Sequence, residues 1–189
     1  MVHYLFKTYL KLTGWKAVNG IPPDLKNFVM VVGPHTSSWD IFMGFAFRGY
    51  LKLGHVKFIA KKELFRPPFG AIFRKLGGVP VDRSSSNNFV DQVVNMFNSN
   101  ESFAIALSPE GTRKKIDRLR TGFYHIAKKA GVPIVLVAFD FGNKEFRFSE
   151  PFYTTEDEAA DIKKVVLFFA GVKGKNPELG LSHLASQFE

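Results

Sequence analysis

Residues 28–40 read Phe28-Val29-Met30-Val31-Val32-Gly33-Pro34-His35-Thr36-Ser37-Ser38-Trp39-Asp40. The first five residues are apolar and do not alternate with polar ones, which is typical of a short strand buried on both faces of a parallel sheet. Gly33 and Pro34 end that strand, and an apolar stretch from Ile41 to Tyr50 follows the polar turn. The stretch therefore predicts a strand, a turn and a helix, as in an α/β sheet.

His35 and Asp40 lie in the polar turn, five residues apart. Ligands of open α/β sheets bind outside the carboxyl ends of the strands, so the pair is a candidate for a general base and the carboxylate that orients it. The spacing Ser37-x-x-Asp40 also fits a helix-capping pattern, in which Asp40 only accepts backbone N–H groups of the first helical turn. The turn alone leaves both interpretations open.

The rest of the chain alternates between short apolar runs and amphipathic stretches. We predict strands at residues 55–60, 79–81, 102–107 and 133–140, and helices at 71–76, 87–99, 121–130 and 156–169. Residues 146–153 predict an antiparallel edge strand, and Pro80 assigns residues 79–81 to an edge or a bulge. Because the chain has no internal repeat and no long linker, we expect one α/β domain over residues 1–189, with no clear pattern at 171–189.

The composition limits the classes of function. The 189 residues carry a net charge of +9, which favours an anionic partner: nucleic acid, an anionic membrane surface or a phosphorylated substrate. We expect no nucleic acid, because no nucleic-acid-binding signature is present. The absence of cysteine excludes disulfides and thiol nucleophiles, and the five histidines lack metal-site spacings, so we predict no metal. No segment is long and apolar enough to span a bilayer, which predicts a soluble or peripheral protein.

Residues 1–20 form an amphipathic N-terminal segment. Lys7 and Lys11 lie opposite one broad helical arc of apolar side chains, which comprises Leu5, Phe6, Tyr9, Leu10 and Leu12. A basic amphipathic helix of this kind either lies in a membrane interface or packs its apolar face on the domain. The sequence leaves both interpretations open.

Polar clusters follow three predicted strands: His35 with Asp40, then Asp82-Arg83-Ser84, then Glu110-Gly111-Thr112-Arg113. If these strands are parallel neighbours, the clusters meet at one edge of the sheet. The planar guanidinium group of arginine binds phosphate at two points, and Gly111 allows backbone N–H groups to approach an anion closely. Taken alone, each arginine is more commonly a solvated surface charge.

The order of these motifs resembles that of the glycerolipid and lysophospholipid acyltransferase superfamily, especially the 1-acylglycerol-3-phosphate acyltransferases and their short bacterial relatives. The resemblance rests on four blocks, which are His35-x-x-x-x-Asp40, Gly78-Val79-Pro80-Val81-Asp82-Arg83, Pro109-Glu110-Gly111-Thr112-Arg113 and Val132-Pro133-Ile134. These blocks define a motif-bearing core over residues 28–140. The resemblance implies a mixed, mostly parallel β-sheet flanked by helices.

The resemblance also implies a reaction. A fatty acyl group would pass from an acyl thioester, either acyl-CoA or an acyl-acyl carrier protein, to a hydroxyl of a lysolipid or glycerol-phosphate-type acceptor, without a further cofactor. His35 is then the general base, and Asp40 holds its other ring nitrogen. The implied acceptor-binding residues are Arg83, Glu110, Gly111, Thr112 and Arg113. We expect a cytoplasmic protein, bound peripherally to the anionic inner face of the cytoplasmic membrane.

Three residues depart from the pattern of the superfamily, namely Pro34, Ser108 and Lys114. None of them removes a catalytic group, but they leave the identity of the acceptor open, and the donor and the acyl-chain length are open as well. The alternative function is a non-catalytic membrane-binding or lipid-binding module of the same fold. The net charge and the amphipathic start favour that alternative, whereas the intact His35/Asp40 pair argues against it.

Overall fold

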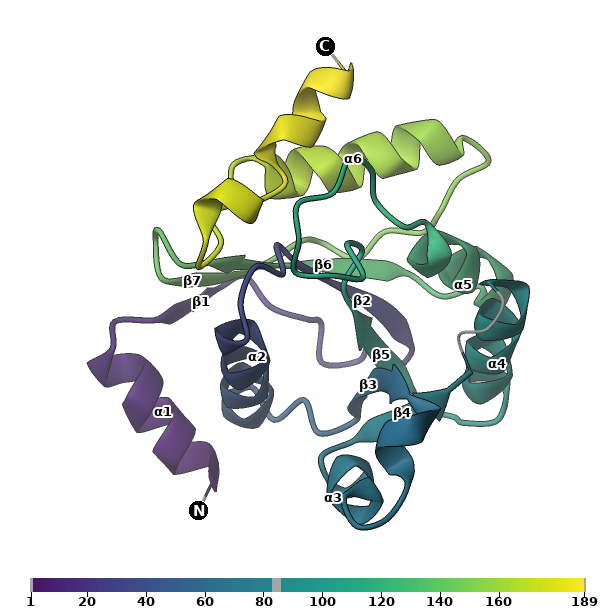
Figure 1. The fold of residues 1–189 in the computed structure, drawn as a ribbon, viewed down its shortest axis with the longest axis horizontal. Helices are drawn as coiled ribbons and strands as arrows, with labels where there is room; N and C mark the ends of the chain where they lie inside the picture. Colours follow the sequence, from purple (N-terminus) through teal and green to yellow (C-terminus); the bar gives the residue numbers. More distant parts are fainter. Residues whose placement is uncertain (1, 83–85, 189) are drawn as a thin grey trace.

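The computed structural model describes residues 2–82 and 86–188, which form a seven-stranded sheet with helices on both faces (Figure 1). The strands follow the order β1-β7-β6-β2-β5-β3-β4 across the sheet. Their bounds are Lys16–Val18 (β1), Phe28–Gly33 (β2), Val56–Lys61 (β3), Gly78–Val81 (β4), Ala104–Leu107 (β5), Ile134–Asp140 (β6) and Glu145–Phe148 (β7). β6 and β7 are antiparallel, and every other neighbouring pair is parallel. The predicted mixed, mostly parallel α/β fold is therefore confirmed.

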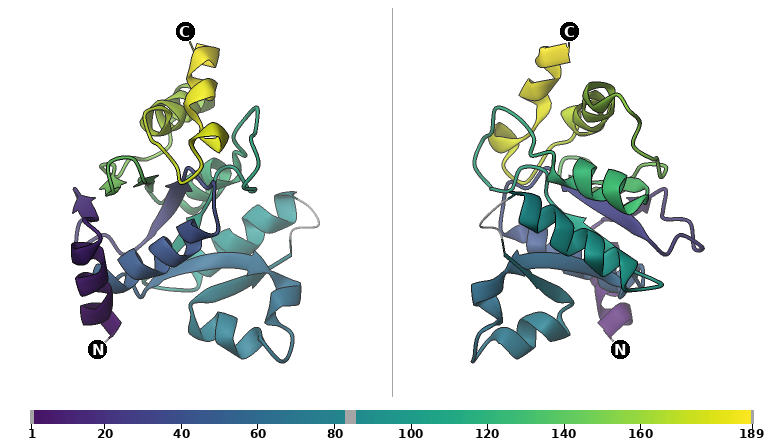
Figure 2. Two further views of the ribbon diagram at one scale, coloured as in Figure 1. Left: turned by 60° about the vertical axis from the view of Figure 1, so that its left-hand side comes forward. Right: turned by 90° about the vertical axis from the view of Figure 1, so that its right-hand side faces the viewer.

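The helices form two layers around this sheet. They are α1 (Val2–Leu12), α2 (Trp39–Tyr50), α3 (Gly70–Lys75), α4 (Ser86–Asn98), α5 (Gly122–Ala130) and α6 (Glu158–Ala170), with 3-10 turns η1 (Lys62–Phe65), η2 (Pro177–Leu179) and η3 (Ser182–Phe188). Helices α1, α2 and α3 lie on one side of the sheet, and α4, α5 and α6 lie on the other (Figures 1 and 2). No helix within residues 2–82 and 86–188 is long and apolar enough to cross a membrane.

The central strand β2 explains why its sequence does not alternate. Val29 and Val31 pack in the cluster beneath α4, α5 and α6, while Phe28 and Met30 pack in the cluster beneath α1 and α2. Because successive side chains of a strand point to opposite faces, both faces of β2 require apolar residues. β2 pairs with β6 on one side and β5 on the other, so the turn that follows it lies near the middle of the sheet.

The sequence predicted the edge of the sheet at β4 but not the edge at β1. Pro80 lies in β4, which is the outermost strand beyond β3, as predicted. The predicted strand at 146–153 is antiparallel to β6, but it is not an edge strand, because β1 pairs with its outer side. β1 has only three residues, too few to show a period of two, and the sequence therefore did not indicate it.

Helix α1 divides its apolar side chains between the protein and the surface. Leu10 is buried against the domain, and Phe6 and Tyr9 make edge contacts with Phe42 of α2. Leu5 and Leu12, in contrast, are 66% and 82% exposed. The predicted apolar arc of α1 is therefore divided: Phe6, Tyr9 and Leu10 pack on the domain. Leu5 and Leu12 point away from it.

The residues after α6, which gave no clear pattern, fold back over the molecule. η3 packs along α6, where Lys163 donates to the backbone carbonyl of Phe188 at 3.3 Å. Residues 172–176 return to the carboxyl end of the sheet, because the carbonyl of Lys173 accepts the N–H of Phe141 at 2.8 Å, just after β6. This return brings the segment to the turn that follows β2.

Candidate active site

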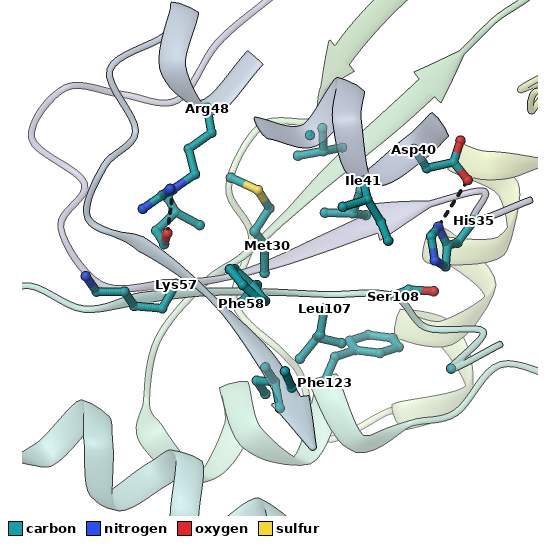
Figure 3. Close-up of a pocket in the computed structure, with 18 of the residues that line it drawn as sticks. Met30, His35, Asp40, Ile41, Arg48, Lys57, Phe58, Leu107, Ser108 and Phe123 are labelled. Carbon is teal, nitrogen blue, oxygen red and sulfur yellow. Dashed lines mark hydrogen bonds and ion pairs between the residues drawn. The ribbon is translucent and has the colours of Figure 1, made fainter. Parts of the chain in front are cut away.

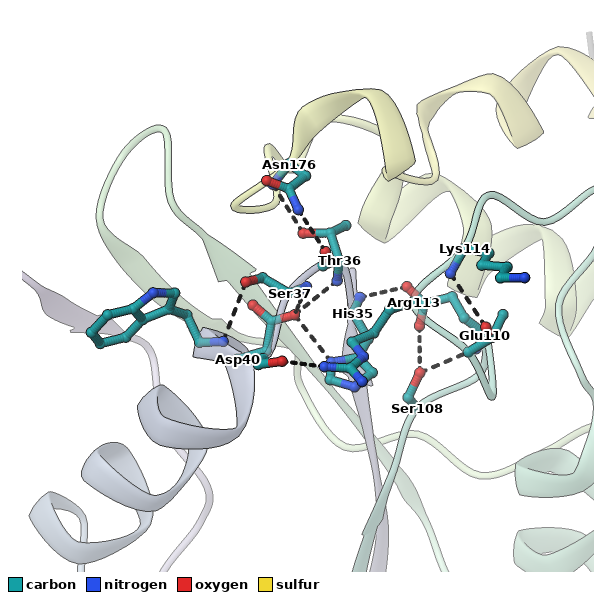
Figure 4. A network of polar contacts seen from close by, with 12 residues as sticks. His35, Thr36, Ser37, Asp40, Ser108, Glu110, Arg113, Lys114 and Asn176 are labelled. Atoms are coloured by element: carbon teal, nitrogen blue, oxygen red, sulfur yellow. Dashed lines mark hydrogen bonds and ion pairs between the residues drawn. The ribbon is translucent and has the colours of Figure 1, made fainter.

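His35 lies on the turn after β2, and Asp40 lies in the first turn of α2 (Figure 4). The distance between His35 Nδ1 and Asp40 Oδ2 is 3.0 Å. The same oxygen accepts the backbone N–H groups of Thr36 and Ser37, each at 2.8 Å. Asp40 therefore contacts the imidazole ring and also binds the backbone of Thr36 and Ser37, which precede α2 rather than belong to its first turn.

The contacts of Asp40 determine which nitrogen of His35 is available. An ionised carboxylate only accepts hydrogen bonds, so Nδ1–H of His35 is the donor and the lone pair of the neutral ring lies on Nε2. The side chain of His35 is 25% exposed and lines a cavity, whereas that of Asp40 is 1% exposed. A histidine with one nitrogen fixed and the other open to a cavity can accept a proton from a bound hydroxyl.

Glu110 follows β5, the neighbour of β2, and holds the backbone of His35. Its Oε1 accepts the His35 N–H at 2.6 Å, and its Oε2 accepts the Ser108 hydroxyl at 2.6 Å. Glu110 is almost completely buried, and this burial raises the pKa of its carboxyl, against the opposing effect of the two hydrogen bonds. Both oxygens are thus bound within the protein, a contact that the sequence did not predict.

The loop after Glu110 brings the next predicted residues to the same turn. Arg113 donates from Nη1 to the hydroxyl of Ser38, immediately before α2, so its guanidinium group lies beside the turn (Figure 4). Gly111 lines the cavity with a positive φ of 65°, and a Cβ there would lie 2.8 Å from Arg120. The hydroxyl of Thr112 accepts the N–H of Lys114 at 3.3 Å. Gly111, Thr112 and Arg113 therefore share one loop beside His35.

Of the remaining predicted cluster, Asp82-Arg83-Ser84, the structure describes only Asp82. Arg83 lies outside the described residues. Asp82 lies just after β4, which β3 separates from β5, and the Asp82 N–H donates to Gln92 Oε1 of α4 at 3.1 Å. The predicted meeting of strand ends is therefore confirmed for β2 and β5, whereas β4 lies at the edge of the sheet.

A cavity of about 1240 Å³ extends from His35 beneath α2 and also reaches Phe89 of α4 and Phe123 of α5. His35 and Ser108 lie at one end of it and Arg48 and Lys57 at the other, with apolar side chains between them (Figure 3). These intervening residues include Met30, Ile41, Phe58 and Leu107. The cavity is larger than most small-molecule sites and is predominantly apolar, so it suits a long apolar group whose reactive end lies at His35.

Three residues of α2 line this cavity at a spacing of four residues: Asp40, Gly44 and Arg48. Residues four apart share one face of a helix, which provides a signal that the sequence analysis missed. Arg48 donates to the carbonyls of Val56, Leu76 and Gly54 at 3.0, 3.0 and 2.9 Å. Partial burial lowers the pKa of Arg48. Arg48 thereby connects the end of α2 to the segments beside β3 and α3.

The site contains acid–base groups and cations but no metal cluster. Within residues 2–82 and 86–188, no three His, Asp or Glu side chains are grouped so that they could hold a metal ion. Among the described groups, the imidazole of His35 is of a kind that can transfer a proton, and the guanidinium group of Arg113 is of a kind that can bind an anion.

Comparison with known proteins agrees with this geometry. The family model described as Acyltransferase matches residues 18–140, which include β2, the turn with His35 and Asp40, and the loop of Arg113. The chain belongs to the acyltransferase family. The 1-acyl-sn-glycerol-3-phosphate acyltransferase of Haemophilus influenzae is 30% identical over 135 residues, covering 67% of this chain and 54% of that protein.

The Salmonella typhimurium protein with the same description is 28% identical over 142 residues, covering 71% of this chain and 56% of that protein. The chain thus spans about half the length of the curated relatives it matches. No solved structure matches it.

Proposed function

We propose that this member of the acyltransferase family transfers a fatty acyl group from an acyl thioester to a hydroxyl of a glycerol-phosphate-type lysolipid. The observation that carries the proposal is the His35/Asp40 pair at the mouth of a long apolar cavity. Relatives described as 1-acyl-sn-glycerol-3-phosphate acyltransferases support the class of acceptor. The donor, acyl-CoA or acyl-acyl carrier protein, is a substrate, and no cofactor is proposed.

The reaction follows from the position of the open nitrogen of His35. Nε2 removes the proton of the acceptor hydroxyl while the oxygen attacks the thioester carbonyl carbon, and Asp40 stabilises the imidazolium that forms. The tetrahedral intermediate then collapses, the carbon–sulfur bond breaks, and the thiolate leaves with the proton from Nε2. No covalent acyl-enzyme is needed, because the acceptor itself is the nucleophile.

The acceptor phosphate is assigned to the cations beside the turn. Arg113 provides a planar two-point donor, and Gly111 and Thr112 provide backbone N–H groups on the same loop. Arg83 remains part of the proposed acceptor site on the basis of the sequence alone. Acceptor binding by Glu110 also rests on the sequence alone, and because its two oxygens bind His35 and Ser108, we propose that Glu110 positions the turn instead.

The acyl chain is assigned to the cavity beneath α2, with its carbonyl carbon at His35. Ile41, Leu64 and Leu76 line the cavity and are also 54%, 44% and 40% exposed, so the rim of the cavity is apolar. A lipid chain can enter across such a rim without passing a polar barrier. This arrangement supports an enzyme that works at a membrane surface.

The membrane contact is assigned to the side of the sheet that carries α1, α2 and α3. Of the twelve exposed large apolar residues in the described part of the chain, ten lie there: Tyr4, Leu5, Leu12, Trp39, Ile41, Phe42, Leu64, Phe69, Ile72 and Leu76. Lys7, Lys11, Arg66, Arg74 and Lys75 are exposed on the same elements, which suits an anionic lipid surface. We assign this contact to the cytoplasmic face of the inner membrane.

A non-catalytic lipid-binding module is the second candidate, and one experiment separates the two. The purified protein is incubated with a labelled acyl-CoA or acyl-acyl carrier protein and a panel of lysolipids with and without phosphate, and the products are analysed. We expect a diacylated phospholipid from the phosphorylated acceptors. Lipid binding without any product from either donor would support the module instead.

A further inference from the structure

The segment after α6 makes direct contact with the catalytic turn (Figure 4). The backbone N–H of Asn176 donates to Thr36 Oγ1 at 3.1 Å, and its side-chain Nδ2 donates to the Thr36 carbonyl at 2.9 Å. Thr36 is only 2% exposed, so these bonds are shielded from water. Asn176 thus holds both the side chain and the backbone of the residue that follows His35.

Gly174 makes this contact possible. A Cβ at position 174 would lie 2.6 Å from Thr36 Oγ1, 2.7 Å from Thr36 Cγ2 and 3.2 Å from Pro34 Cγ. A side chain at this position would therefore push the segment away from the turn. The start of the segment is held beside the sheet, because the Lys173 carbonyl accepts the N–H of Phe141, the residue after β6.

Thr36 connects this segment to the catalytic pair. Its N–H donates to the same oxygen of Asp40 that contacts His35 Nδ1. We infer that residues 173–176 form a clamp that positions the His35/Asp40 pair, with Asn176 as the positioning residue. The clamp lies outside residues 18–140, the part that matches the family model.

The physical reason for such a clamp is the sensitivity of catalysis to the geometry of the base. The turn is a loop, and loops open locally at low free-energy cost unless other segments hold them. A displacement of about 1 Å at a reacting group can reduce a rate about a hundredfold. Two hydrogen bonds to Thr36 from a segment anchored on β6 reduce the freedom of the turn.

The first test measures the local opening of the turn and does not require an activity assay. Amide hydrogen exchange is followed at His35, Thr36 and Ser37 in the wild-type protein and in Asn176→Ala, which loses the Nδ2 bond. We expect exchange at Thr36 and Ser37 to be about tenfold faster or more, with an unchanged melting temperature to within a few degrees. Gly174→Ala should accelerate the same amides.

The matched control is Asn27→Ala at the opposite end of β2. Asn27 Nδ2 donates to the Glu101 carbonyl at 3.1 Å, and Asn27 Oδ1 accepts the Phe103 N–H at 2.7 Å, so its chemistry is like that of Asn176. We expect this variant to leave exchange in the turn unchanged. Equal acceleration in both variants, or no acceleration in Asn176→Ala, would overturn the clamp.

The second test rests on the proposed function and measures turnover. Asn176→Ala should lower kcat about tenfold at unchanged KM for donor and acceptor, because the clamp touches neither substrate. Asn176→Asp should lower kcat at least as far, since a carboxylate cannot donate to the Thr36 carbonyl. A raised acceptor KM with unchanged kcat would contradict positioning. If the wild-type protein transfers no acyl group, the proposed function fails, and hydrogen exchange still decides the clamp.

Discussion

At the scale of the residue, Glu110 distinguishes positioning from substrate binding. Glu110→Gln keeps an oxygen that can accept the His35 N–H, whereas Glu110→Ala leaves that buried donor without its partner. We expect Glu110→Gln to retain activity within severalfold and Glu110→Ala to lower kcat about tenfold or more, both at wild-type acceptor KM. Steady-state kinetics of the two variants test this prediction. An increase in acceptor KM in both variants would show instead that Glu110 binds the acceptor.

The pKa of Glu110 gives a second prediction at this scale. Burial raises this pKa in the folded protein, so between the unfolded-state value and the raised value the native state holds the proton more tightly. The contribution of Glu110 to stability is therefore present at acid pH and is lost as the pH rises through the raised pKa. Glu110→Gln removes this dependence, so its melting temperature relative to that of the wild type should rise as the pH increases from the ordinary glutamate pKa through the raised pKa of Glu110. If the melting temperatures of Glu110→Gln and of the wild type change with pH in the same way, the prediction is wrong.

The sequence indicated the proposed catalytic pair because both members lie within one turn. His35 and Asp40 follow a recognisable strand and precede a recognisable helix, and the contact between them is local. The contact between Glu110 and His35 joins residues 75 positions apart, and it depends on β5 lying beside β2. That strand order is a tertiary property, so the pattern of residues around Glu110 did not indicate its partner.

At the scale of the element, α2 presents Asp40, Gly44 and Arg48 to the cavity. Glycine within a helix lowers its stability by about 1 kcal/mol relative to alanine. The open cavity beside Gly44 gives a reason for a glycine at this position. A Cβ at Gly44 would lie 3.6 Å from Phe139, which is ordinary contact, but a longer side chain would extend into the lining.

This position predicts the effect of chain length. Gly44→Leu should lower kcat/KM for long-chain donors about tenfold or more relative to short-chain donors, because its side chain fills part of the cavity. Gly44→Ala is the matched control and should melt at a higher temperature with little change in that ratio. The measurement is a series of acyl thioesters of increasing length. The same ratio of long-chain to short-chain activity in Gly44→Leu and the wild type would mean that the acyl chain binds elsewhere.

Elements differed in how well the sequence predicted them, for physical reasons. The buried strands β2 and β6 and the helices α4 and α5 carry long apolar patterns, and their existence and type were predicted. β1 is too short for a pattern, and residues 171–188 are held by contacts with α6 and Thr36 rather than by their own periodicity. The segment that forms the clamp was therefore absent from the predicted site.

At the scale of the whole molecule, most of the exposed large apolar side chains of the described residues lie on one side of the sheet, together with a group of lysines and arginines. We expect the protein to pellet with anionic vesicles, less so in high salt, and weakly with neutral vesicles. Leu5→Ser with Leu12→Ser should reduce pelleting at an unchanged melting temperature, because both side chains are more than 60% exposed.

The control for this prediction lies away from that side. Tyr153 and Leu167 are 65% and 51% exposed, and Leu167 belongs to α6 on the opposite side of the sheet. Tyr153→Ser with Leu167→Ser should leave vesicle binding unchanged. Equal loss of binding in both double variants would show that general hydrophobicity, and not the α1–α3 side, causes the association.

The central claim is that the open nitrogen of His35 accepts the proton of the acceptor hydroxyl. It is tested most directly by the rate of acyl transfer from a labelled thioester in His35→Ala, measured at saturating donor and acceptor. We expect kcat of His35→Ala to fall about a hundredfold or more, with similar KM values and a melting temperature close to that of the wild type. A folded His35→Ala protein that transfers the acyl group at the wild-type rate would contradict the account.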